Sequence, residues 1–196
     1  MTLAQLQPTT VVPDVDEAWT LYANIFAEVN NLAAQRHLMT SAEFHAIYHD
    51  PRVLKFYTRD EAGGLAGMSV LTQDLDAWPL ISPTFFARRW PDHYARKAIW
   101  YVGFVGVAPN GLNGFRDLVG KMYPHVIGNA GVAVMDFCTY NVTHRRLPAV
   151  TLKLLSWVNP AAAMETVDAQ QFVVYTFDQI QEAAELSSPW RPSLKD

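Results

Sequence analysis

An almost unbroken apolar segment, residues 98–108, constrains the fold of this chain more than any other feature. Its side chains are apolar at both odd and even positions, which is typical of a strand covered on both faces of a sheet. Gly103 and Gly106 interrupt the segment, and glycine inside a strand often marks a β-bulge or the close approach of another chain or a ligand. The segment predicts the central strand of an α/β domain.

The composition indicates a single domain over residues 1–196. Half of the residues are hydrophobic, enough for one sizeable core, and the chain is too short for two ordinary domains. Charged residues make up 17%, below the roughly 25% of a typical globular chain, and 12% are aromatic. The excess apolar surface requires a large core, a ligand tunnel or a subunit interface, and the last of these would imply a homodimer.

The charge distribution argues against nucleic acid as a partner. The net charge is −4, and the longest basic clusters are the arginine pairs at 88–89 and 145–146, too few for a nucleic-acid groove. Cys138 is the single cysteine, which excludes internal disulfides and cysteine-based metal cages and fits a reducing compartment. No signal peptide and no membrane-spanning run of about 18 apolar residues is recognisable, so we expect a cytoplasmic protein without a membrane span.

The first half of the chain predicts an arm, two helices and a hairpin. Residues 7–12 can form a first strand or an ordered arm. Amphipathic helices are expected over residues 14–32 and 40–49, each opened by a capping-box pair, Asp14 with Glu17 and Thr40 with Glu43. Strands at 53–58 and 65–72 flank a turn that ends in two glycines, which predicts a hairpin.

The second half alternates helices and strands. Ser82 and Pro83 predict the start of a helix within the long segment 74–97. Apolar residues at helical spacing predict a helix over 115–127, which Pro124 should bend or end early. We then expect a strand at 131–139, a helix at 148–158, a closing hairpin of 164–167 with 171–177, and a short helix at 178–186.

This order of elements resembles the GNAT superfamily of acyl-CoA-dependent N-acyltransferases over residues 11–177. The most specific part is the strand that ends in Val105, Gly106 and Val107, followed by Ala108, Pro109, a glycine-containing loop and a helix. The resemblance implies an α/β (α+β) fold with a mixed, mostly antiparallel central sheet flanked by helices on both faces. It also implies that the central strand bulges and splays from its neighbour.

The resemblance implies a binding site for an acyl-CoA donor and no metal. In that family the freed backbone of the splayed strand, here residues 105–107, hydrogen-bonds the pantetheine arm. The following loop, here Asn110, Gly111, Asn113 and Gly114 around Leu112, presents backbone N–H groups at a helix N-terminus to the pyrophosphate. Asn141 falls where the family often has an asparagine that contacts the pantetheine.

Leu112, Phe115 and Asp117 stand where the family pattern has Arg or Gln and two glycines. Two interpretations follow. Either the loop has a different register, or the acyl carrier is not held by its pyrophosphate. The second interpretation favours a degenerate GNAT-like domain that binds a ligand or a protein partner without catalysis, or a synthase that takes its acyl group from a carrier protein.

Three polar residues are the candidates for chemistry around the acceptor. Tyr101 and Asp136 each lie on a strand that is otherwise apolar, and Tyr140 follows the second of these strands. Burial would raise the pKa of Asp136 and suit it to act as a base, while a structural pairing of Asp136 is the alternative. For Tyr101 the alternative is an ordinary core aromatic residue.

The remaining candidates have simpler structural explanations. Cys138 has no histidine partner at a recognisable spacing and fits a small buried residue. His45 and His49 have the spacing of a helical zinc pair but lack a third ligand. Six aromatic residues form either a lid packed on the sheet or the wall of an acyl or acceptor pocket: Trp78, Phe85, Phe86, Trp90, Tyr94 and Trp100.

The resemblance therefore implies an N-acyltransferase that moves an acyl group from acetyl-CoA or a longer acyl-CoA to an amine of a small molecule or peptide. The non-catalytic binding domain and the carrier-protein-dependent N-acyl synthase remain the alternatives.

Overall fold

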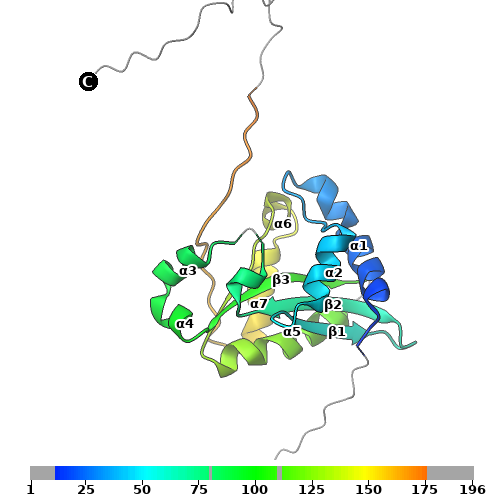
Figure 1. Cartoon of the computed structure of the whole chain (residues 1–196), viewed down its shortest axis with the longest axis horizontal. Coiled ribbons are helices and arrows are strands. Elements are labelled where there is room, and N and C mark those ends of the chain that lie inside the picture. Colours follow the sequence, from blue (N-terminus) through cyan, green and yellow to red (C-terminus); the bar gives the residue numbers. More distant parts are fainter. Residues whose placement is uncertain (1–11, 80, 110–111, 176–196) are drawn as a thin grey trace, which may run out of the picture. The chain divides into compact units, whose positions relative to one another are not determined.

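The computed structural model describes residues 12–79, 81–109 and 112–175 (Figure 1). The helices and strands of this part all lie in the first of two units, residues 1–164. The second unit, residues 165–196, is described over 165–175, and this stretch contains no helix or strand.

The core of the first unit is a four-stranded sheet in the order β1-β2-β3-β4. The first three strands are antiparallel, and β4 is parallel to β3. The strands are β1 (Leu54–Arg59), β2 (Leu65–Thr72), β3 (Ile99–Val107) and β4 (Val132–Val134). The sheet is thus mixed and mostly antiparallel, as the sequence predicted.

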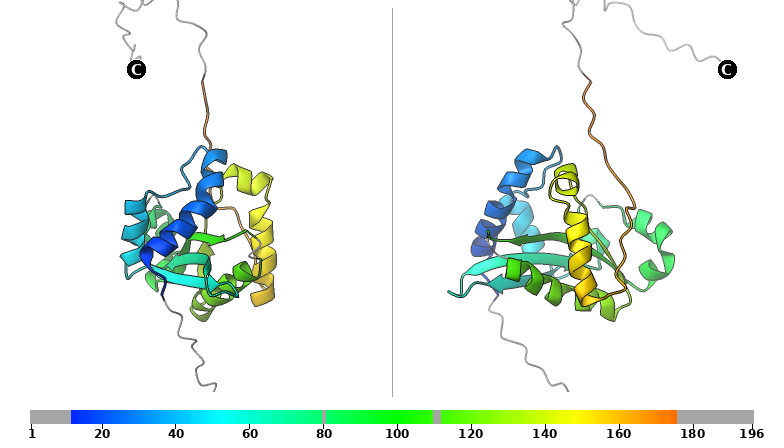
Figure 2. Two further views of the ribbon diagram at one scale, coloured as in Figure 1. Left: turned by 90° about the vertical axis from the view of Figure 1, so that its right-hand side faces the viewer. Right: turned by 180° about the vertical axis from the view of Figure 1, so that it is seen from behind.

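Helices cover both faces of this sheet, which confirms the predicted fold class (Figure 2). On one face lie α1 (Val15–Leu32) and α2 (Ser41–His49), and on the other α5 (Leu112–Gly128) and α7 (Leu147–Val158). Between β2 and β3 the chain forms η1 (Leu75–Ala77), α3 (Pro83–Arg89) and α4 (Pro91–Ala95), and α6 (Thr139–Thr143) follows β4.

Two hydrophobic clusters, one on each face, hold the layers together. The first cluster joins Tyr22 of α1 and Phe44 of α2 to Phe104 of β3, with ring centroids 4.8–6.4 Å apart. The second cluster places Met122 of α5 and Leu155 of α7 against the opposite face. Since both faces of β3 are buried, its continuous apolar sequence is explained.

The predicted interruption of β3 at Gly103 is a β-bulge. Val70 of β2 pairs with Phe104, whereas the next residue, Leu71, pairs with Val102, so Gly103 is the extra residue. The bulge reverses the alternation of side chains along β3. As a result, Tyr101 and Phe104 both belong to the first cluster, although they are three residues apart.

Most helix ends follow their sequence signals. Thr40 and Glu43 form the predicted capping box, with Glu43 N–H donating to Thr40 Oγ1 at 3.3 Å. Ser82 caps α3 and accepts from Phe85 N–H. The capping box predicted at α1 is wrong, because the Asp14 carboxylate accepts from Asp16 N–H instead.

The helix predicted over 115–127 is present as α5, and Pro124 does not end it early, because burial of side chains in its last turns outweighs one missing hydrogen bond. Two other predictions are wrong. The strand predicted at 131–139 pairs over only three residues. The described part of the predicted hairpin, residues 164–175, contains no strand, and an isolated two-stranded hairpin is marginal in water.

Two predicted elements fall outside the described residues. They are the first strand or arm at residues 7–12 and the helix at 178–186. Of the first element, the structure describes Val12, which lies outside any strand. From α1 to α7 the order of elements is the one on which the GNAT resemblance rests.

The indole of Trp78 lies directly on Gly103, and this contact yields a test of the bulge. A Cβ atom at position 103 would lie 2.2 Å from Trp78 Cη2, which is impossible without movement of a buried ring. We expect Gly103→Ala to lower the free energy of unfolding by about 1–3 kcal/mol, measured by urea denaturation.

Gly120 is the matched control for this substitution. It lies in α5, and a Cβ there meets no atom within 4 Å, so Gly120→Ala should raise the free energy of unfolding by about 0.5–1 kcal/mol. Adding Trp78→Ala should remove most of the cost of Gly103→Ala, because the clashing ring is gone. Wild-type stability in Gly103→Ala would contradict this packing.

Candidate functional site

The candidate site begins where β3 and β4 part. The two strands pair at three positions only, ending with Tyr101 opposite Val134. Beyond Tyr101, β3 continues to Val107 and pairs with β2 on its other side. In the described part of the chain, residues 102–107 have no ladder partner on the β4 side, so the predicted splay is present.

Asp136 and Tyr101 meet at the base of this fork, the point after Tyr101 and Val134 where β3 and β4 no longer pair. Val132 and Val134 of β4 face the first cluster, and Ala133 faces the second. Because side chains alternate between the two faces of a strand, Asp136 comes to lie on the same face as Tyr101. The Tyr101 hydroxyl, on a side chain only 4% exposed, donates a hydrogen bond to Asp136 Oδ1. Two of the three predicted catalytic residues are therefore brought together.

The expectation that Asp136 is buried is wrong. Its side chain is exposed, because β4 ends at Val134 and the chain leaves the sheet before any helix can cover residue 136. Asp136 thus presents one carboxylate oxygen to a buried tyrosine and remains accessible from solvent.

Tyr101 is held in its protonated form. Burial is the main cause that raises its pKa above the ordinary value, and the charge of Asp136 and the hydrogen bond to it add to the effect. The neighbouring Trp78 side chain, whose ring centroid lies 5.6 Å from that of Tyr101, partly opposes the rise in pKa. At neutral pH Tyr101 is therefore a hydrogen-bond donor to Asp136.

The predicted donor-binding strand has the expected backbone. Val105, Gly106 and Val107 pair with Ser69, Met68 and Gly67 of β2, which leaves their other edge toward the fork. The close approach predicted at Gly106 comes from α1, since a Cβ there would lie 3.0 Å from Ile25 and Phe26 side-chain atoms.

The loop after β3 is shorter than the sequence predicted. Helix α5 begins at Leu112, so Asn113 and Gly114 belong to its first turn, and Gly114 packs against Thr58 of β1. Asn110 and Gly111 lie outside the described residues, as does the side chain of Asn113. The described residues thus place only the helix N-terminus, not the loop itself.

The carboxylate of Asp117, which would repel a pyrophosphate, has a cationic partner. Lys121 Nζ lies 2.6 Å from Asp117 Oδ2 and also donates to the Tyr57 carbonyl at 2.8 Å. The ion pair reduces the negative potential near the start of α5. Lys121 was missed as a relevant residue, although its i,i+4 spacing from Asp117 was visible in the sequence.

Helix α6 contains the two remaining candidates. Tyr140 stacks on His144 at 4.7 Å and lies under the Arg145 guanidinium, so its ring contacts residues at and just after the end of α6 and not Tyr101 or Asp136. Among the residues that the structure describes, the buried Asn141 side-chain oxygen has no hydrogen-bond partner. An unpaired buried acceptor fits an N–H donor of a bound ligand.

The aromatic group mainly forms core. Trp78 and Phe86 are buried in the first cluster and Trp90 packs against it, which supports the packed-lid interpretation. Trp100 lies in the second cluster on the other face of the sheet, so the six residues do not form one pocket wall. Phe85 and Tyr94 are each 39% exposed.

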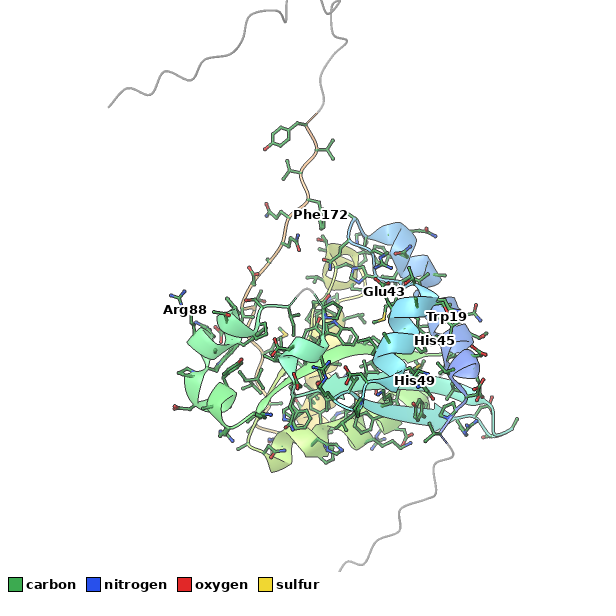
Figure 3. All side chains as sticks on the ribbon, in the orientation of Figure 1. Trp19, Glu43, His45, His49, Arg88 and Phe172 are labelled. Carbon is green, nitrogen blue, oxygen red and sulfur yellow. The ribbon has the colours of Figure 1, made fainter. Side chains whose placement is uncertain are left out.

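The histidines and the cysteine add no further site. His45 and His49 lie one turn apart on α2 (Figure 3), but within residues 12–79, 81–109 and 112–175 no three His, Cys, Asp or Glu side chains gather to hold a metal ion. Cys138 is a half-buried free thiol. None of the described helices combines the length and the apolar character that crossing a bilayer requires.

Two solved structures of low sequence identity align with this chain. No family model and no curated protein matches the sequence. A tetramutant of the BH1408 protein from Bacillus halodurans is 11% identical to this chain, with a TM-score of 0.49. The aligned region covers 83% of this chain and 97% of the BH1408 chain. A ribosomal-protein-alanine N-acetyltransferase from Brucella melitensis biovar Abortus 2308 is 13% identical over 84% of this chain and 96% of its own, with a TM-score of 0.44. At such identities a similar fold does not imply a shared site.

The buried tyrosines predict a loss of stability at alkaline pH. Burial raises the pKa of Tyr22 to about 12, and it also raises the pKa of Tyr101 above the ordinary value of about 10. Above pH 10 the unfolded chain releases these protons while the folded chain keeps them, so the stabilisation present below pH 10 is lost as the pH rises.

Above pH 10 the free energy of unfolding of Tyr101→Phe should fall less steeply with pH than that of the wild-type protein. We expect the slopes to differ by up to about 1.4 kcal/mol per pH unit. Urea unfolding between pH 8 and 11.5 measures the slope. Identical slopes for Tyr101→Phe and the wild-type protein would contradict the burial of the Tyr101 hydroxyl.

Proposed function

We propose that this protein is an N-acyltransferase that moves an acyl group from an acyl thioester, acetyl-CoA or a longer acyl-CoA, to an amine of a small molecule or peptide. The observation that supports this function best is the fork between β3 and β4 with the Tyr101–Asp136 pair at its base. A cytoplasmic location, expected from the sequence, is part of the same proposal.

The free edge of β3 is suited to the pantetheine arm of the donor. Pantetheine contains two amide groups, which can pair with backbone N–H and C=O groups of residues 105–107 as an added strand would. The unpaired oxygen of Asn141 offers a further acceptor. These groups would hold the thioester near the point where the strands part.

The acceptor amine would react beside Asp136. Its nitrogen attacks the thioester carbonyl carbon, a C–N bond forms, and the C–S bond breaks to release the thiolate. Asp136 takes the proton that the amine loses, and the proton reaches the thiolate through solvent, so the products are an amide and a free thiol. Positioning of the two reactants supplies much of the rate in such a step.

The short loop favours a second candidate, a domain that binds its ligand without turnover. Leu112 starts the helix without the family's Arg or Gln, and Asn113 and Gly114 are taken up by the first helical turn. The same observation is compatible with a donor attached to a carrier protein, because such a donor does not need a pyrophosphate site. Binding and turnover experiments separate these functions.

Calorimetric titration tests donor binding. We expect heat of binding with acetyl-CoA, with a long-chain acyl-CoA or with free CoA, because all three share the pantetheine arm. The absence of heat with all three would exclude a CoA-dependent enzyme. Binding without product after hours of incubation with a panel of amines would favour the non-catalytic domain.

Substitution of Asp136 tests the chemistry. We expect Asp136→Asn to lower kcat/KM about 100-fold or more, because the amide cannot take the proton of the amine. Asp92→Asn, at an exposed position in the first turn of α4, is the matched control and should retain wild-type kcat/KM. Unchanged turnover in Asp136→Asn would remove Asp136 from the mechanism.

A further inference from the structure

The stretch from α6 to the end of the first unit carries positive charge and no negative charge. Residues 137–164 contain Arg145, Arg146 and Lys153 but no Asp or Glu, although the chain as a whole has a net charge of −4. Large apolar side chains of this stretch are open to solvent, with exposed fractions of 40–59% at Val142, Val150, Trp157, Val158 and Met164. Exposed apolar groups among charges of one sign are typical of a binding surface.

Helix α7 presents part of this surface as a stripe. Helix α7 packs on the second cluster through Leu155, and none of its residues is buried. Val150, Lys153 and Trp157 follow one another at spacings of three and four residues, so they lie on one face of the helix. All three are exposed, and Figure 2 shows α7 at the outside of the layer that covers the sheet. We call these three residues the α7 stripe.

Arg116 of α5 extends the α7 stripe toward the proposed donor strand. The guanidinium carbon of Arg116 lies 5.5 Å from the centroid of the Trp157 ring, which is a cation–π contact. Arg116 comes four residues after Leu112, with which α5 begins beyond the end of β3. Among the described residues, neither Arg116 nor Lys153 forms an ion pair. Both charges are therefore available to a partner.

The charge and the length of this surface favour an acidic protein as its occupant. From Arg146, just before α7, to Trp157 the helix rises about 16 Å, or three turns, which is the length of an average helix in a globular protein. A second copy of this chain would bring the same cations against one another, and like charges repel. A bilayer is also a poor occupant, because the Arg116 guanidinium holds a charge over the Trp157 ring and opposes insertion of the ring into lipid.

We propose that the α7 stripe and Arg116 form the docking surface for an acidic acyl carrier protein, which delivers the acyl thioester to the fork between β3 and β4. The choice of this partner rests on the proposed acyl transfer. A carrier protein and CoA present the acyl group on the same pantetheine arm, but the carrier protein needs no pyrophosphate site. This agrees with the start of α5 at Leu112, without the Arg or Gln of the family pattern. The thiol that the transfer releases stays on the carrier protein.

Charge reversal at Lys153 tests this docking surface. Lys153→Glu keeps a good helix former at an exposed position, so the fold should be retained. Arg88→Glu is the matched control, because Arg88 is an exposed cation of α3 whose side chain points away from the sheet (Figure 3). The probe is a holo acyl carrier protein loaded with an octanoyl thioester, titrated calorimetrically into the wild-type protein and each variant.

We expect Lys153→Glu to raise the Kd for the carrier protein about ten-fold or more, and Arg88→Glu to change it less than about two-fold. Trp157→Ala should also weaken binding, because the exposed aromatic ring is the apolar anchor of the surface. Raising the salt concentration should weaken binding to the wild-type protein, since exposed charges are screened. Equal affinity of Lys153→Glu and the wild-type protein, or no binding of the carrier protein, would overturn the proposal.

Two further measurements test the other occupants. Binding to vesicles of phosphatidylcholine and phosphatidylserine that Lys153→Glu abolishes, in place of carrier binding, would assign the surface to a membrane. A dimer in sedimentation equilibrium that Lys153→Glu dissociates would assign it to a second copy. Either result would overturn the proposal. Carrier binding through the α7 stripe without product from any amine would refute the acyl transfer alone, whereas turnover of acyl-CoA without carrier binding would refute the docking surface alone.

Discussion

The parting of β3 from β4 after Tyr101 and Val134 is the constraint on which the site depends. A parallel pair that continued for the full length of β3 would occupy the backbone of residues 102–107 on both sides. Because pairing stops after three residues, one edge of β3 remains available, and the chain beyond β4 can bring Asp136 back to Tyr101. The same break leaves Asp136 accessible to solvent.

The bulge at Gly103 connects the core to this fork. It turns both Tyr101 and Phe104 toward the first cluster, where Phe104 packs against Tyr22 of α1 and Phe44 of α2. It also makes room for Trp78, a core residue whose ring lies beside that of Tyr101. Stability and the proposed chemistry therefore depend on the same few side chains.

Local signals predicted the elements well where packing agreed with them. The capping box of α2, the proline-led start of α3 and the apolar run of β3 are all short-range features, and each was found close to its expected place. The errors arose where a longer-range contact decided the outcome. The strand predicted at 131–139 pairs over three residues, and residues 164–175 form no strand.

By itself, the sequence determined that β3 is a two-sided central strand, that glycines interrupt it, and that Tyr101 and Asp136 are polar exceptions on apolar strands. These are properties of residue type and spacing. Only the tertiary structure decided that β4 ends early, that Tyr101 donates to an exposed Asp136, and that Trp78 joins them while Trp100 lies on the opposite face. Such relations depend on strand pairing and on a one-residue bulge, which bring together residues far apart in the chain, and no local pattern records them.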